Sequence, residues 1–198
     1  MQRMTPSSVV IEARGLRAPM DYGVLQHALD LDIAAGLTAI TGDEGVGKSV
    51  LLRLLAGVTS PAAGHCTPVE ACCLDLRLPD SDAHTPIEVW QRLSSRFPHW
   101  DAALCHTLAE GLQLTPHLHK PLYQLSTGSR RKVAITASVA SGARLVCLDQ
   151  PWMALDLASI HVLRALLREA ADSPDRAWVI ADYEADPTLP WGQVIQLP

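Results

Sequence analysis

A glycine-rich stretch near residue 45 restricts the fold of this chain more than any other part of its sequence. The letters TGDEGVGKSVLL run from Thr41 to Leu52 and contain a glycine, four further residues, and then glycine, lysine and serine. The apolar run LTAIT (37–41) ahead of the glycines predicts a strand, and SVLLRLLAGV (49–58) behind them has apolar residues at helical spacing. Strand, glycine loop and helix in this order are the context that a phosphate-binding loop requires.

The chemistry of phosphate binding explains each fixed position of this loop. Backbone N–H groups and the N-terminus of the helix would surround the phosphates, Lys48 would reach their β and γ oxygens, and the Ser49 hydroxyl would bind Mg²⁺. Asp43 and Glu44 occupy variable positions, and we expect their side chains to face solvent, so that their charge weakens binding without forbidding it. A glycine-rich turn without a ligand stays open as the alternative. The candidate nucleotide-binding residues here are Gly42, Asp43, Glu44, Gly45, Val46, Gly47, Lys48, Ser49 and Val50.

Strand and helix patterns alternate along most of the chain. The runs 9–13 and 29–35 alternate like half-buried strands, and further strand-like runs cover 71–78, 144–149, 177–182 and 193–197. A capping box at Thr85 to Glu88, a cap at Asp101 and a helix start near Ser126 make the region from about 85 to 142 mostly helical, and a last helix is expected over 156–171. These patterns predict an α/β fold with a mostly parallel sheet, an antiparallel N-terminal β piece and an inserted helical subdomain. A single domain, 1–198, would have its core in 1–80 and 143–198 and its helical subdomain at about 85–142.

Composition and charge exclude several classes of partner. The net charge of −5, without a long lysine and arginine run, gives no footprint for nucleic acid or for an anionic membrane surface. The five cysteines include no C-x-x-C pair, and the N-terminal sequence lacks the pattern of a secretion signal, so we expect a reducing cytoplasm. The longest apolar-leaning stretch, 133–148, is interrupted by polar residues, so no direct membrane span is expected.

A second region identifies a family of phosphate-loop proteins. The stretch YQLSTGSRRKVAITASVASGARLVCLDQPWMALD (123–156) resembles the segment from the signature to the D-loop of ATP-binding cassette (ABC) ATPases. LSTGS (125–129) resembles the LSGGQ signature, with Thr127 and Ser129 departing from it. Asp149 resembles the Walker B aspartate, and ALD (154–156) resembles the D-loop. Because YGVLQHALDLDIAAGLTAITG (22–42) also looks like the opening of such cassettes, the resemblance covers nearly the whole chain. It makes Tyr22 the candidate aromatic that stacks on adenine, and an ordinary loop tyrosine stays open as the alternative.

The resemblance implies a P-loop NTPase fold and a specific assembly. ATP and Mg²⁺ would lie between the phosphate loop of one protomer, with Ser49 and Asp149 at the metal, and the signature residues Ser126 and Gly128 of another. The partner would be a second copy or another ABC ATPase, and the dimer would drive a separate membrane permease from the cytoplasmic face of the cell membrane. The short cassette and the wording QPWMALD are most similar to ATPase subunits of the cytochrome-c-biogenesis haem-exporter type. The alternative is a non-transport ABC protein that uses ATP as a conformational or assembly switch.

Three positions depart from the family pattern. Gln150 stands where these ATPases carry a glutamate that polarises water, and an amide cannot accept a proton. Asp182 and Tyr183 stand where the switch histidine is expected, and the Q-loop glutamine is not visible, since the next glutamine, Gln91, lies in a predicted helix. We therefore expect slow hydrolysis, with Asp149, Gln150 and Tyr183 as the candidate catalytic residues.

Four other groups of residues give weaker indications of function. For the histidines His117 and His119, a solvated loop is favoured over a metal site. The basic cluster SRRKV (129–133) is interpreted as a solvated face that also attracts nucleotide. For the aromatic segment RFPHW (96–100), packing in the core is favoured over a permease-docking surface, and for Trp152 burial and a dimer interface stay equally open.

Overall fold

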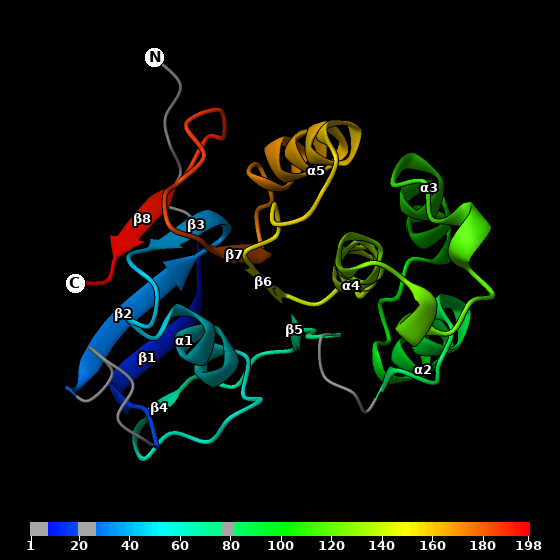
Figure 1. The fold of residues 1–198 in the computed structure, drawn as a ribbon. Coiled ribbons are helices and arrows are strands. Elements are labelled where there is room, and N and C mark those ends of the chain that lie inside the picture. Colours follow the sequence, from blue (N-terminus) through cyan, green and yellow to red (C-terminus); the bar gives the residue numbers. More distant parts are fainter. Residues whose placement is uncertain (1–7, 20–26, 77–80) are drawn as a thin grey trace. The chain divides into compact units, whose positions relative to one another are not determined.

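The computed structural model describes residues 8–19, 27–76 and 81–198, so the candidate adenine-stacking residue Tyr22 lies outside the described residues. The chain forms two compact units, which are described separately (Figure 1). The first comprises Met1–Cys73, Arg144–Gln150 and Leu166–Pro198, and the second comprises Leu74–Ala143 and Pro151–Ala165.

A parallel sheet of five strands forms the centre of the first unit. Its order is β5 (Ala71–Cys73), β6 (Leu145–Asp149), β7 (Ala177–Ala181), β3 (Gly36–Thr41) and β8 (Gln193–Gln196). All residues of β3 and β7 are buried, as expected for central strands of a sheet that is covered on both faces. Helix α1 (Lys48–Leu55) contacts β6 and β7 and contributes five apolar residues to the hydrophobic core.

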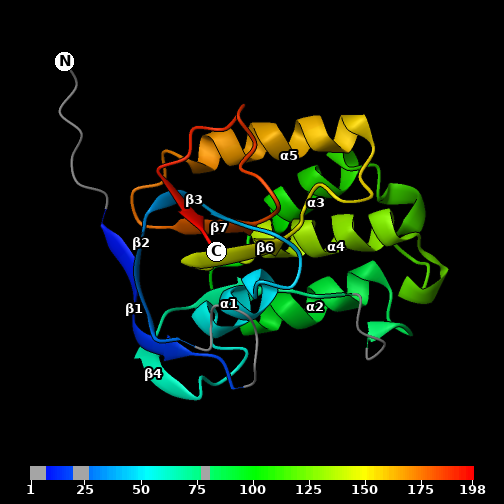
Figure 2. The same cartoon turned by 60° about the vertical axis from the view of Figure 1, so that its left-hand side comes forward.

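A second, antiparallel sheet belongs to the same unit (Figure 2). Strand β1 (Val9–Arg17) lies between β2 (Leu29–Ala34) and β4 (Ala63–Cys66). The sequence patterns did not predict β4, because three of its four residues are exposed and it has no apolar alternation. The predicted α/β class, with a parallel sheet and an antiparallel N-terminal piece, is confirmed by these two sheets.

Helices dominate the second unit. They are α2 (Pro86–Arg96), α3 (Ala102–Gly111), the 3₁₀ turns Thr115–His117 and Leu122–Gln124, and α4 (Thr127–Ala140), while α5 (Leu157–Ala170) begins in this unit and ends in the first. Helix α4 contacts both α2 and α3. The indole N–H of Trp90 donates to the Val133 carbonyl at 3.2 Å, and Phe97 is 4% exposed, so core packing is confirmed for Phe97.

Two predicted helix starts are confirmed at the level of hydrogen bonds. The Thr85 hydroxyl accepts from the Glu88 N–H while the Glu88 carboxylate accepts from the Thr85 N–H at 2.8 Å, which is the reciprocal pattern of a capping box. The Asp101 carboxylate accepts from the Leu104 N–H at 2.8 Å and caps α3. Among the described residues, no helix is long and apolar enough to cross a membrane.

Candidate functional site

The glycine loop connects β3 to α1 at one edge of the parallel sheet. Gly42, Gly45 and Gly47 have φ angles of 144°, 82° and 104°, which L side chains rarely adopt. A Cβ atom on Gly42 would also lie 2.7 Å from the Leu197 carbonyl oxygen. The loop therefore needs glycine for its backbone path, which leads directly into the first turn of α1.

Lys48 is the buried cation of this loop. The residue is only 6% exposed, and its Nζ donates to the Gly42 and Asp43 carbonyl oxygens at 2.6 Å each. Asp43 and Glu44 are exposed, as expected, so their carboxylates are not packed into the loop. Ser49 follows in the first turn of α1 and is half-buried. An ammonium held among loop carbonyls beside a helix N-terminus fits an anionic ligand such as a phosphate group.

Three chain segments bring further candidate residues to the same edge of the sheet. Asp149, the last residue of β6, is in register with Ala181 of β7, and Ala181 is in register with Ile40 of β3. Beyond these positions, the Gln150 N–H donates to the Ala181 carbonyl at 2.8 Å and the Asp182 N–H donates to the Ile40 carbonyl at 3.0 Å. The loop, Asp149, Gln150 and the residues after β7 thus lie at the carboxyl ends of neighbouring parallel strands, where open α/β sheets bind ligands.

Gln150 has an unusual backbone conformation. Its φ angle is 46°, in the left-handed region that non-glycine residues seldom occupy. Such strained conformations cluster at functional sites when the surrounding structure determines them. The side chain there is a half-buried amide, which can orient a water molecule by hydrogen bonds but cannot remove its proton.

Tyr183 contacts the phosphate-loop lysine directly. Its ring centroid lies 5.0 Å from Lys48 Nζ, within the range of a cation–π interaction. Its own N–H donates to the Asp182 carboxylate at 2.8 Å, and its carbonyl accepts from the Gly42 N–H at 3.4 Å. Sequence reasoning placed Tyr183 near the site but did not foresee its contact with Lys48, because the two residues are far apart along the chain.

The signature segment belongs to the second unit. Ser126 is exposed, and its hydroxyl accepts from the Ser129 N–H at 3.1 Å, so it caps α4. Gly128 is buried, and a Cβ atom there would lie 2.2 Å from the Ala154 carbonyl oxygen. The start of α4 therefore packs directly on the D-loop of the same chain, and only glycine allows this approach.

The interpretation of SRRKV as a solvated basic face is wrong. The Lys132 side chain is 11% exposed and its Nζ contacts the Asp156 carboxylate at 2.5 Å. Arg131 donates to the Met153 carbonyl, and Arg130 forms an ion pair with Asp82. Arg131 and Lys132 have these partners because α4 packs against the D-loop segment, whereas Arg130 pairs with a residue ahead of α2. Sequence periodicity does not reveal either contact.

Removing Lys132 should change how stability depends on pH. The hydrogen bond from Lys132, followed by that from the Ser159 N–H, lowers the pKa of Asp156. A lowered carboxyl pKa contributes stability above about pH 4, the unfolded value, and this contribution is lost as the pH falls further. Lys132→Met should lower the free energy of unfolding at pH 7 by about 1 kcal/mol or less, because half of the Asp156 side chain is exposed and solvent screens the pair.

Thermal unfolding followed by circular dichroism between pH 3 and 7 measures this effect. The difference in melting temperature between Lys132→Met and the parent protein should narrow as the pH falls below 5. Lys120→Met, which alters an exposed lysine of the same unit, is the matched control. A difference in melting temperature that stays constant down to pH 3 would mean that the ion pair does not stabilise the D-loop segment.

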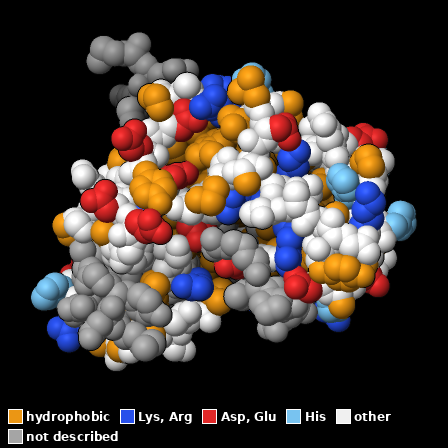
Figure 3. All heavy atoms as spheres, in the orientation of Figure 1, with side chains coloured by type: hydrophobic (Ala, Val, Ile, Leu, Met, Phe, Trp, Pro, Cys, Tyr) orange, Lys and Arg blue, Asp and Glu red, His pale blue; other side chains and the backbone are white. Residues whose placement is uncertain are grey.

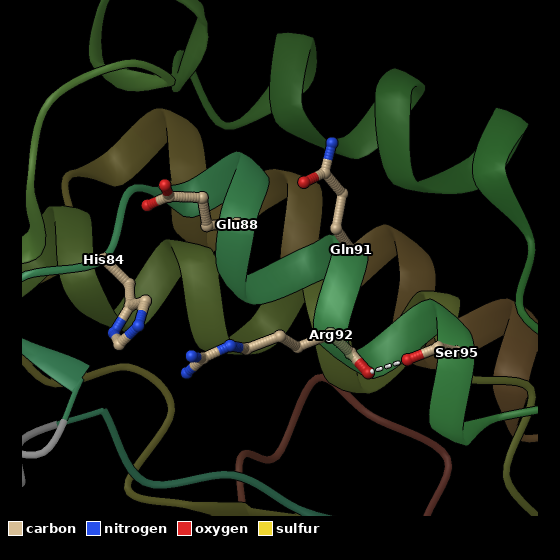
Figure 4. A pocket seen from close by; sticks show the side chains of 5 residues that line it. All are labelled: His84, Glu88, Gln91, Arg92 and Ser95. Atoms are coloured by element: carbon tan, nitrogen blue, oxygen red, sulfur yellow. Dashed lines mark hydrogen bonds between the residues drawn. The ribbon is translucent and has the colours of Figure 1, made fainter.

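A separate hollow of about 410 Å³ lies along α2 (Figure 4). It is lined by His84, Glu88, Gln91, Arg92 and Ser95, which includes the glutamine considered for the Q-loop. Glu88 is held by the capping box, and the Ser95 hydroxyl donates to the Arg92 carbonyl at 2.8 Å.

On the face drawn in Figure 3, acidic and basic side chains are interspersed. Within the described residues there is no group of three or more His, Cys, Asp or Glu side chains that could hold a metal ion.

Comparison with known proteins decides the family. A family model described as ABC transporter matches residues 27–153. The chain belongs to the ABC transporter family, as an ATP-binding subunit. The ABC subunit is 30% identical over 203 residues to the cytochrome c biogenesis ATP-binding export protein CcmA of Pseudomonas syringae pv. tomato, with 96% of this chain and 95% of the relative covered. It is also 37% identical over 135 residues to CcmA of Novosphingobium aromaticivorans, with 68% of each chain covered.

A further relative agrees with this family, and a solved structure agrees with the fold. The ABC subunit is 28% identical to the aliphatic sulfonates import ATP-binding protein SsuB 3 of Paraburkholderia xenovorans, over 94% of this chain and 75% of the relative. Its fold matches a putative ABC transporter ATP-binding protein from Pyrococcus furiosus with a TM-score of 0.73 and 19% identity, over 94% of this chain and 96% of the other. Family membership implies nucleotide binding and ATP hydrolysis as the class of activity.

Proposed function

We propose that this ABC subunit binds Mg·ATP in a head-to-tail dimer and hydrolyses it slowly to drive a separate membrane permease. The observation that carries the proposal is the buried Lys48 ammonium at the sheet edge, in a loop that ends at the N-terminus of α1. Lys48 would bind the β and γ phosphates, and the backbone N–H groups of the loop would hold the remaining oxygens. Ser49 and Asp149 would hold Mg²⁺, which supplies positive charge that neutralises the phosphates.

The second half of the site is proposed to come from another protomer. Ser126 is exposed at the N-terminus of α4, a helix of 14 residues whose dipole favours an anion at this end. The γ-phosphate of ATP on one protomer would dock against Ser126 and Gly128 of its partner. The partner is a second copy of this chain or another ABC ATPase.

Transport is favoured over a role as a conformational or assembly switch. The relatives named above are described as export or import ATP-binding proteins, which supports a transport partner for this chain as well. The subunit would then work at the cytoplasmic face of the membrane, bound to a permease on another polypeptide. If the switch alternative held, ATP would still promote assembly, but no permease would change the rate of hydrolysis.

The composite site predicts that ATP drives dimer formation through Ser126. Ser126→Asp keeps a side chain that caps helices well but places a carboxylate where the γ-phosphate would dock. Because like charges in a desolvated interface cost several kcal/mol, the ATP-promoted association constant should fall by about tenfold or more. Sedimentation velocity with and without Mg·ATP measures the change.

Ser126→Asn is the matched control for this experiment. Asparagine caps a helix as well as aspartate does and has nearly the same shape, but it carries no charge. It should retain much more of the ATP-promoted association than Ser126→Asp. If the parent stays monomeric with saturating ATP, alone and with each partner cassette, or if the Asp and Asn variants associate equally, the head-to-tail arrangement is wrong.

A further inference from the structure

Two of the three donor directions of the Lys48 ammonium are already occupied. An ammonium has three N–H donors, and two of those on Lys48 are directed at the Gly42 and Asp43 carbonyl oxygens at 2.6 Å. The Tyr183 ring covers another side of the same atom at 5.0 Å. A phosphate oxygen that approaches Lys48 from the side of the ring must therefore displace the ring.

The ring is the easier contact to displace. Both carbonyls belong to the phosphate loop itself and accept charged hydrogen bonds, whereas a ring face attracts a cation more weakly. The backbone of Tyr183 is held on both sides, by the Asp182 N–H bond to the Ile40 carbonyl at 3.0 Å and by the Gly42 N–H bond to the Tyr183 carbonyl at 3.4 Å. The ring cannot follow Lys48 by a backbone shift without breaking these bonds.

We propose that the Tyr183 ring competes with the nucleotide phosphates for the Lys48 ammonium and so lowers the affinity of the site for ATP and ADP. This inference rests on the proposed nucleotide function of the loop, and it makes Tyr183 a residue that sets affinity. Its role is additional to any hydrogen bond from the phenol, since the ring face and not the hydroxyl contacts Lys48. Nucleotides that lack a β-phosphate would not contact Lys48, so the affinity for AMP should not depend on the ring.

A graded set of substitutions at Tyr183 tests the competition. Tyr183→Leu keeps bulk but removes the ring face, and it should bind ATP and ADP about two- to fivefold more tightly than the parent, as expected for losing a cation–π contact whose aromatic residue is 45% exposed. Tyr183→Phe keeps the ring face and should show the lower affinity, and Tyr183→Trp, with the best ring for a cation, should bind most weakly. Tyr123→Leu, which alters an exposed tyrosine of the other unit, is the matched control. Titration calorimetry with ATP, ADP and AMP gives the affinities.

Nuclear magnetic resonance supplies a second measurement that needs no nucleotide. The chain has only three lysines, Lys48, Lys120 and Lys132, so protein labelled with ¹³C-lysine gives few CεH₂ signals. The Lys48 signal should be shifted upfield by the Tyr183 ring, lose this shift in Tyr183→Leu, and lose it in the parent when ATP is added.

The outcomes separate this inference from the proposed function. Tighter binding by Tyr183→Leu together with loss of the upfield shift supports the competition. If the parent binds ATP and Tyr183→Leu binds it equally or more weakly, the ring does not compete and the inference is wrong. If the parent does not bind ATP at all, the proposed function fails, whatever the lysine signals show about the Lys48–Tyr183 contact, and the competition fails with it.

Discussion

Gln150→Glu should raise the steady-state rate of ATP hydrolysis by roughly tenfold or more if the missing general base limits turnover. Glutamate has nearly the shape of glutamine, and the Gln150 backbone is held by its N–H bond to the Ala181 carbonyl. The new carboxylate would therefore occupy the place of the amide at the edge of the sheet and could accept a proton from water. Adding Tyr183→His should raise the rate further, because a histidine could bind the γ-phosphate and would no longer cover Lys48 as the tyrosine ring does.

Phosphate release at saturating Mg·ATP is the measurement, with Lys48→Ala as the background. Gln113→Glu is a close control, since Gln113 also has a positive φ, of 58°, and lies in the other unit. It makes the same change of charge and should leave the rate as it is. A parent that already turns over at about 1–10³ s⁻¹, as ordinary enzymes do, together with an unchanged rate in Gln150→Glu, would refute the slow-hydrolysis proposal.

The main elements of the fold could be predicted because their signals are local. The strand ahead of the glycine loop, the capping box at Thr85 and the cap at Asp101 each depend on residues within a few positions of one another, and the structure confirms them. Strand β4 was missed because its pairing with β1 depends on contacts distant in sequence. Gly64 of β4 lies so close to Gly15 that a Cβ atom there would be 2.2 Å from the Gly15 carbonyl oxygen.

The same limit applies to the candidate site. The loop and Asp149 could be proposed from sequence because their residue types and spacing follow from phosphate and metal chemistry. The Tyr183 ring over Lys48 and the Lys132–Asp156 ion pair could not, because each joins segments that only the tertiary structure brings together. A lysine in a basic cluster looks solvated in sequence, and only the packing of α4 on the D-loop segment shows that Lys132 is buried.

Lys48→Ala should reduce the affinity for ATP by on the order of 10- to 100-fold, since charge-assisted hydrogen bonds to phosphate contribute about 1.5–3 kcal/mol. The lysine also bonds to two loop carbonyls, so alanine removes contacts that shape the loop. Lys48→Met retains the aliphatic stem and removes only the charge, and it should lose most of the same affinity. Lys120→Ala, an exposed lysine in the other unit, should bind ATP as the parent does.

Titration calorimetry of the parent protein with Mg·ATP is the most direct test that this chain is a working ATP-binding cassette subunit. The proposal predicts saturable binding in the parent that is largely lost in both Lys48→Ala and Lys48→Met, while circular dichroism shows that the variants stay folded. No binding by the folded parent up to millimolar ATP, or equal binding by the parent and both Lys48 variants, would contradict it.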